Sequence, residues 1–155
     1  MLLFLLLPLM LENPSFTLGE APVDIRLNPL FQGLSLTLSE RVDNTFCFLV
    51  LPDCERCAGT LDLAAALQDK YDVIVVFAAT EKQRLAAEIK ASGFALQDAY
   101  VVNPSEIKAL DFKSFPLVLC YRGARLHFAG SARFRIDDYR KFISFYERKP
   151  KGQHR

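Results

Sequence analysis

Two cysteines separated by two residues, Cys54 and Cys57, have the spacing in this chain that most clearly indicates chemistry. The motif CERC follows an apolar run, 46–51, and precedes a predicted helix over 58–70. A helix N-terminus carries unpaired backbone N–H groups and a partial positive charge, which favour a thiolate. The spacing also brings the two sulfurs within bonding reach. The pattern therefore predicts a redox pair, in which Cys54 attacks a disulfide and Cys57 resolves the mixed disulfide.

A CxxC pair also occurs in zinc sites and in structural disulfides. A zinc site needs four ligands, and the chain has no second CxxC and only His127 and His154 as histidines. No metal site is therefore expected. A structural disulfide is the alternative that the spacing leaves open, although so short a loop stabilises a fold little.

Two charged neighbours should tune the reactivity of the first cysteine. Asp53 directly precedes Cys54, and its carboxylate should disfavour the thiolate. Arg56 lies between the two cysteines and should favour it, as the helix terminus does. The two charges and the helix terminus act in opposite directions, so the net direction of the shift in the Cys54 pKa does not follow from the sequence.

Length and composition indicate one globular domain with a substantial core. The chain has 155 residues, 51% of them hydrophobic, and a formal net charge of +1. Its 19 basic residues nearly balance 18 acidic ones, without a basic stripe interleaved with aromatic residues, so nucleic acid is not an expected partner. The basic tail at 148–155 is typical of a solvated terminus, and no function is assigned to it.

The amino terminus differs in character from the rest of the chain. Residues 1–11 read MLLFLLLPLML, which is too short to span a bilayer but matches the apolar region of a signal peptide. No Lys or Arg precedes Arg26, so the usual positive start is missing. We expect residues 1–18 to form a signal or membrane-anchor segment with its linker, and 19–147 to form the domain. The alternative is an N-terminal strand or helix packed on that domain.

The hydrophobic pattern predicts the elements that position the cysteines. Alternating runs at 23–27 and 34–38 predict a β-hairpin, and 116–121 with 125–129 predict another. The apolar runs 46–51 and 73–77, separated by a helical segment, predict a βαβ unit with parallel buried strands.

Further helices and one short strand complete the predicted order. Thr80 with Gln83 predicts a capping box for a helix over 81–92, which Gly93 should end. A strand is expected near 100–102, followed by a short helix that Ser105 caps. The spacing of apolar residues predicts a last helix over 136–146.

This order of elements, with CxxC after a strand and Ser114-Phe115-Pro116 before the second hairpin, is similar to the thioredoxin fold over residues 22–146. The fold class expected is α/β, a three-layer sandwich around a central mixed sheet with an added N-terminal β-hairpin. The hairpin resembles that of the redoxin branch. In that branch lie the membrane-anchored thiol-disulfide oxidoreductases of the cytochrome c maturation and methylamine-utilisation type.

The resemblance implies roles for four residues. Cys54 and Cys57 would be catalytic, and Pro116 would take the place of the cis-proline that faces the disulfide. Phe115 would then pair its backbone with an extended substrate chain. The implied partners are a protein dithiol or disulfide substrate and an upstream redox partner, without a cofactor. A tether through residues 1–11 and a location outside the cytoplasm are favoured, with a cytoplasmic location left open.

Several positions depart from the family pattern. The chain has no Trp before Cys54, and the strand 46–51 holds no acid where thioredoxins carry a buried carboxylate. Leu51 stands where peroxidase relatives have a threonine, which disfavours peroxide reduction, and copper-delivery relatives need a wider cysteine spacing. A redox-inactive binding or metal-delivery module remains the alternative function. Cys47 and Cys120 are expected to be buried free thiols.

Overall fold

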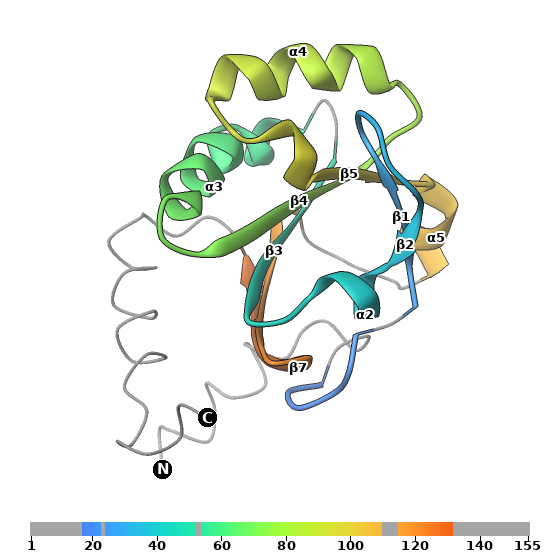
Figure 1. Ribbon diagram of the computed structural model, residues 1–155, viewed down its shortest axis with the longest axis vertical. Coiled ribbons are helices and arrows are strands. Elements are labelled where there is room, and N and C mark those ends of the chain that lie inside the picture. Colours follow the sequence, from blue (N-terminus) through green and yellow to red (C-terminus); the bar gives the residue numbers. More distant parts are fainter. Residues whose placement is uncertain (1–16, 23, 52–53, 110–114, 132–155) are drawn as a thin grey trace.

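The computed structural model describes residues 17–22, 24–51, 54–109 and 115–131. Within them, one mixed sheet has the strand order β2-β1-β5-β4-β3-β6-β7 (Figure 1). The central strands β3, β4 and β5 are parallel, whereas β1, β2, β6 and β7 run antiparallel to their neighbours. The strands are β1 Arg26–Pro29, β2 Leu36–Thr37, β3 Thr45–Val50, β4 Asp72–Ala78, β5 Ala99–Val102, β6 Leu117–Arg122 and β7 Arg125–Ser131.

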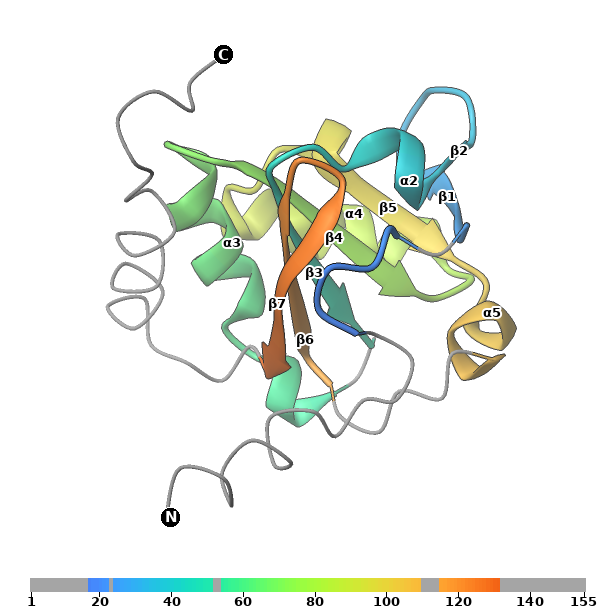
Figure 2. The same cartoon turned by 90° about the horizontal axis from the view of Figure 1, so that it is seen from below.

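Helices lie on both faces of the sheet and make three layers (Figures 1 and 2). The longer helices α3 (Thr60–Gln68) and α4 (Lys82–Ser92) cover one face, and the short helices α2 (Leu38–Arg41) and α5 (Pro104–Ala109) lie on the other. Short 3-10 turns, η1 (Glu55–Cys57) and η2 (Leu96–Asp98), complete the described elements. The α/β sandwich expected from the sequence is confirmed.

Strand β3 shows why the sheet is buried on both faces. All of its residues are buried, and those from Phe46 to Val50 alternate between two core clusters. Phe46, Phe48 and Val50 pack toward α3 and α4, whereas Cys47 and Leu49 pack toward α2 and α5. A period-2 alternation in which both sets are apolar is the pattern of a central parallel strand covered by helices on each side.

The predicted N-terminal hairpin is present, with Leu27 opposite Leu36 in an antiparallel register, but its strands are Arg26–Pro29 and Leu36–Thr37 and not the runs 23–27 and 34–38. Its second strand leads directly into α2 through a capping box that the sequence analysis missed. The Thr37 hydroxyl accepts a hydrogen bond from the Glu40 N–H at 3.3 Å, and the Glu40 carboxylate accepts one from the Thr37 N–H at 2.8 Å. These reciprocal bonds satisfy N–H groups at the start of a helix of only four residues.

Two capping predictions were wrong. Glu81, with extended backbone and no side-chain cap bond, precedes α4, so the predicted capping box of Thr80 and Gln83 is not formed. At α5 the cap is Asn103 rather than Ser105, because the Asn103 Oδ1 accepts the Ser105 N–H at 3.1 Å. The N-cap thus lies one residue later than predicted at α4 and two residues earlier at α5, so a small shift of the helix start gives the cap position to a different side chain.

A polar cluster around Arg41 joins elements at the amino ends of β3 and β4. The guanidinium donates two bonds to the Asp72 carboxylate, at 2.7 and 2.9 Å, and one to Asp98 at 3.2 Å. It also donates from Nε to the Tyr100 hydroxyl at 3.1 Å, and Thr45 donates to Asp72 at 2.6 Å. The cluster thus ties α2 to β3, β4, β5 and η2 at the end of the sheet opposite the cysteine motif.

The predicted N-terminal segment 1–11, the last helix over 136–146 and the tail 148–155 lie outside the described residues. Among the helices that are described, none is long and apolar enough to cross a membrane.

Candidate redox site

The cysteine motif lies just beyond the carboxyl end of β3. Cys54 has extended backbone, and the turn η1 then folds back so that the Cys57 N–H donates to the Cys54 carbonyl at 3.0 Å. Gly59 follows with φ of 84°, a left-handed conformation that glycine adopts without steric cost, and α3 begins only at Thr60. The motif therefore occupies a 3-10 turn ahead of α3. The predicted helix start at residue 58 was wrong, because the α-helix begins at Thr60.

The two thiols differ in burial and lie in contact. The Cys54 side chain is half-buried, whereas Cys57 is 9% exposed, and a hydrogen bond joins the two sulfurs. Burial, and after it the hydrogen bond with Cys54, together raise the pKa of Cys57 to about 12, against the lowering by a backbone hydrogen bond with Leu51. Both cysteines are free thiols in the structure.

Pro116 and Phe115 lie at the same end of the sheet as the cysteine motif. Leu117, the first residue of β6, pairs with Leu49 of β3, so the residue before β6 and the residues after β3 are neighbours. Pro116 is buried, and the peptide bond between Phe115 and Pro116 is cis, the state that the resemblance implies for this proline. Phe115 is half-buried and, like Cys54, packs at the margin of the core cluster that contains Cys57.

A hollow of about 360 Å³ adjoins the motif. Its lining joins apolar side chains to both cysteines and to two carboxylates, Glu55 from η1 and Glu88 from α4. The complete lining is Val50, Leu51, Cys54, Glu55, Cys57, Ala58, Gly59, Leu61, Phe77 and Glu88. Sequence reasoning did not single out Glu88, because helical spacing places it beside the buried Leu85 and Ile89 but cannot show which strand ends α4 covers.

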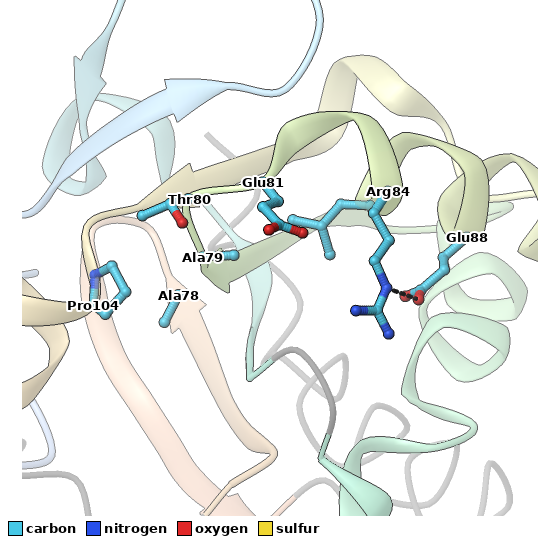
Figure 3. A pocket seen from close by; sticks show the side chains of 8 residues that line it. Ala78, Ala79, Thr80, Glu81, Arg84, Glu88 and Pro104 are labelled. Atoms are coloured by element: carbon cyan, nitrogen blue, oxygen red, sulfur yellow. Dashed lines mark ion pairs between the residues drawn. The ribbon is translucent and has the colours of Figure 1, made fainter.

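A second hollow of about 280 Å³ lies at the carboxyl end of β4 (Figure 3). Thr80, Glu81, Arg84 and Pro104 contribute to its lining, and Glu88 borders this hollow as well as the first. Arg84 and Glu88 point toward one another from successive turns of α4 and form an ion pair at 3.7 Å (Figure 3). Glu88 therefore borders both hollows and pairs with a neighbour on its own helix.

The remaining predicted site residues are placed less completely. Asp53 lies outside the described residues, and only the backbone of Arg56 is described. Cys47 and Cys120 are buried at 0% and 2% exposure, which confirms the prediction of buried free thiols. Burial raises the pKa of both thiols, and they belong to core clusters on opposite faces of the sheet.

Comparison of the whole fold with known proteins gives structural neighbours only. No protein-family model matches the sequence, and no curated protein matches it. A thiol:disulfide interchange protein from a Bacteroides species is similar with a TM-score of 0.69 at 14% identity, over 90% of this chain and 96% of that one. The thioredoxin domain of a thiol-disulfide oxidoreductase from Bacteroides vulgatus has a TM-score of 0.65 at 12% identity, over 84% and 98% of the two chains.

A third neighbour is the pneumococcal exposed lipoprotein thioredoxin from Streptococcus pneumoniae. It matches with a TM-score of 0.53 at 16% identity, and the similarity covers 79% of this chain and 99% of that one. At such identities the likeness concerns the fold and not the activity. The element order, the sheet topology and these neighbours together show that the chain has a thioredoxin-like fold.

Proposed function

We propose that this protein is a thiol-disulfide oxidoreductase that exchanges disulfides with protein substrates through Cys54 and Cys57. The observation that carries the proposal is the contact between a half-buried and a buried thiol on one turn, at the same end of the sheet as the buried Pro116. A substrate disulfide reaches the outer sulfur first, because the inner one is covered. The inner sulfur is then within reach of the mixed disulfide that results.

The proposed reaction has two exchange steps. The Cys54 thiolate attacks one sulfur of the substrate disulfide, forms a mixed disulfide and releases the other substrate sulfur as a thiolate. The Cys57 thiolate then attacks Cys54, which breaks the mixed disulfide and releases the second substrate sulfur. The substrate is reduced by two electrons and the pair is oxidised to a disulfide, and the reverse sequence oxidises a substrate dithiol.

Residues beside the pair would orient the substrate and tune the thiols. The Phe115 backbone, at the open end of β6, would pair with an extended substrate segment, and its ring would border the groove. Asp53 and Arg56 remain the predicted tuning residues for Cys54. An upstream dithiol or disulfide partner would return the pair to its starting state, so no cofactor is invoked.

The test is a trapping experiment with matched serine variants. Cys57→Ser should accumulate a mixed disulfide between Cys54 and a disulfide-containing peptide, detected by mass, because the resolving thiol is absent. Cys54→Ser should form none, and Cys120→Ser should turn over like the wild type. If the wild-type chain never exchanges with glutathione disulfide or with the peptide, the protein is a redox-inactive binding module and the proposal fails.

The domain is proposed to work outside the reducing cytoplasm, tethered or exported by residues 1–11. Support comes from the apolar composition of that segment and from the exposed lipoprotein among the structural neighbours. Expression with and without residues 1–18 in a bacterial host, followed by fractionation, tests this. Equal solubility and folding of both forms in the cytoplasm would show that the segment is neither signal nor anchor.

A further inference from the structure

The second hollow lies where two neighbouring strands lead to helices on opposite faces of the sheet. Strands β4 and β5 are parallel neighbours, and the Ala79 N–H donates to the Val102 carbonyl at 3.2 Å where the two strands end. Helix α4, which follows β4, packs on one core cluster through Leu85, whereas α5, which follows β5, packs on the other through Ile107. Helices that diverge in this way leave a crevice at the carboxyl ends of the strands, which is where α/β sheets bind ligands.

The lining of this crevice combines polar side chains with small apolar ones. Thr80, Glu81, Arg84 and Glu88 come from the start of α4 and the connection before it, and Pro104 comes from α5 (Figure 3). The hollow measures about 280 Å³, which is at the low end for pockets that bind small molecules. It therefore suits a single polar side chain better than a larger ligand.

The charges of the lining do not cancel. Glu88 is paired with Arg84 at 3.7 Å, which leaves Glu81 as the second carboxylate. Glu81 makes no capping hydrogen bond at the start of α4, and no ion pair within the described ranges includes it. The chain as a whole has a formal net charge of +1, so this local negative charge does not belong to a generally acidic protein. The crevice thus favours a cationic group that carries N–H donors.

The crevice is adjacent to the redox site. Glu88 borders both hollows, and Cys54 lines the first of them. An extended substrate segment advances by about 3.3 Å per residue, so a segment joined to Cys54 can place a side chain a few residues away in the second hollow. Arginine suits the lining well, because its planar guanidinium has five N–H donors and can bind the Glu81 carboxylate and the Thr80 hydroxyl together.

We propose that the second hollow is a subsite for an arginine side chain of the protein substrate, which Glu81 and Thr80 bind while the substrate cysteine reacts at Cys54. This inference rests on the proposed function and adds a substrate class to it, namely disulfides that have an arginine near one cysteine. The ion pair between Arg84 and Glu88 contributes by leaving one carboxylate open for the incoming cation.

The test uses the reduced full chain and disulfide-linked peptides that each contain one cysteine and one arginine, with the spacing between them varied in both directions. Matched peptides carry citrulline, which keeps the shape of arginine but has no charge. The formation of the Cys54–Cys57 disulfide is followed by mass after acid quenching. At the best spacing, the arginine peptide should oxidise the pair about fivefold faster than the citrulline peptide at low salt, the size of effect expected for a partly exposed ion pair. Added NaCl should reduce this preference.

Two glutamine variants separate the subsite from a general effect of charge. Glu81→Gln should oxidise at the same rate with the arginine and the citrulline peptide. Glu106→Gln removes the same charge from an exposed position on α5 that does not line the hollow, so it should keep the wild-type preference. Equal rates for the two peptides at every spacing in the wild type, or a preference that survives in Glu81→Gln, would overturn the inference. Exchange with glutathione disulfide would then still support the oxidoreductase proposal, whereas absence of exchange with every disulfide would overturn both.

Discussion

A brief pulse of iodoacetamide on the reduced protein should modify Cys54 long before Cys57. The reason is the pKa of Cys57, which burial and the hydrogen bond with Cys54 raise to about 12. At pH 8 a thiol with that pKa is ionised to a fraction of about 10⁻⁴, compared with about one quarter for a thiol at the ordinary value of about 8.5. Thiolate content alone thus slows Cys57 about 2,000-fold relative to an ordinary thiol, and its 9% exposure slows it further.

Peptide mapping by mass spectrometry after timed quenching measures this order. Cys47 and Cys120 serve as internal controls, since both are buried and should label only when the domain opens. In Cys54→Ser, the rate at Cys57 should rise about tenfold for each pH unit between 8 and 11, as expected for a thiol that titrates near 12. Labelling of Cys57 as fast as Cys54, or a pH-independent rate in the serine variant, would refute the assignment of roles.

Two further predictions concern stability. Arg41→Met should lower the free energy of unfolding, measured by urea titration, by about 2 kcal/mol, which is less than for a fully buried pair because the Asp72 side chain is 41% exposed. Arg84→Ala, at an exposed ion pair, should lower it by under about 0.5 kcal/mol. Equal losses in the two variants would contradict this prediction. The hydrogen bonds from Arg41 lower the pKa of Asp72 below its unfolded value, so its contribution is complete above about pH 4 and is lost as pH falls through the folded pKa. Asp72→Asn should therefore flatten the acid side of the stability profile, and an unchanged slope below pH 4 would contradict the reasoning.

The sequence predicted the central sheet well because its signals are strong and local. The run 73–77 is apolar throughout, and β4 extends from Asp72 to Ala78 in parallel register with β3. The second hairpin was confirmed for the same reason, with β6 and β7 joined around Gly123. A short, uninterrupted run of apolar residues predicts a buried strand from its own composition, without knowledge of its neighbours in the sheet.

Helix starts and the surroundings of the thiols could not be read in the same way. The left-handed backbone of Gly59 delays α3 until Thr60. Glycine adopts left-handed and helical backbone about equally readily, so its presence in the sequence does not show where the helix begins. Whether Glu88 borders the same hollow as Cys57 depends on where α4 crosses the strand ends, which is a tertiary arrangement without a local signal. Residues close in space but 31 positions apart in the chain therefore escape a reading based on spacing.

The burial of β3 explains why an acid near these thiols lies on a helix that covers a face of the sheet and not on the strand itself. Every residue of β3 is buried between the two core clusters, so a carboxylate within the strand would lose its hydration and pay a large desolvation cost when charged. Glu88 avoids that cost, because its side chain is 53% exposed and lies next to the Arg84 guanidinium. A carboxylate in this position still borders the hollow that Cys57 lines. The chain thus combines a central strand without an acid with a carboxylate on the helix that covers the carboxyl end of the sheet.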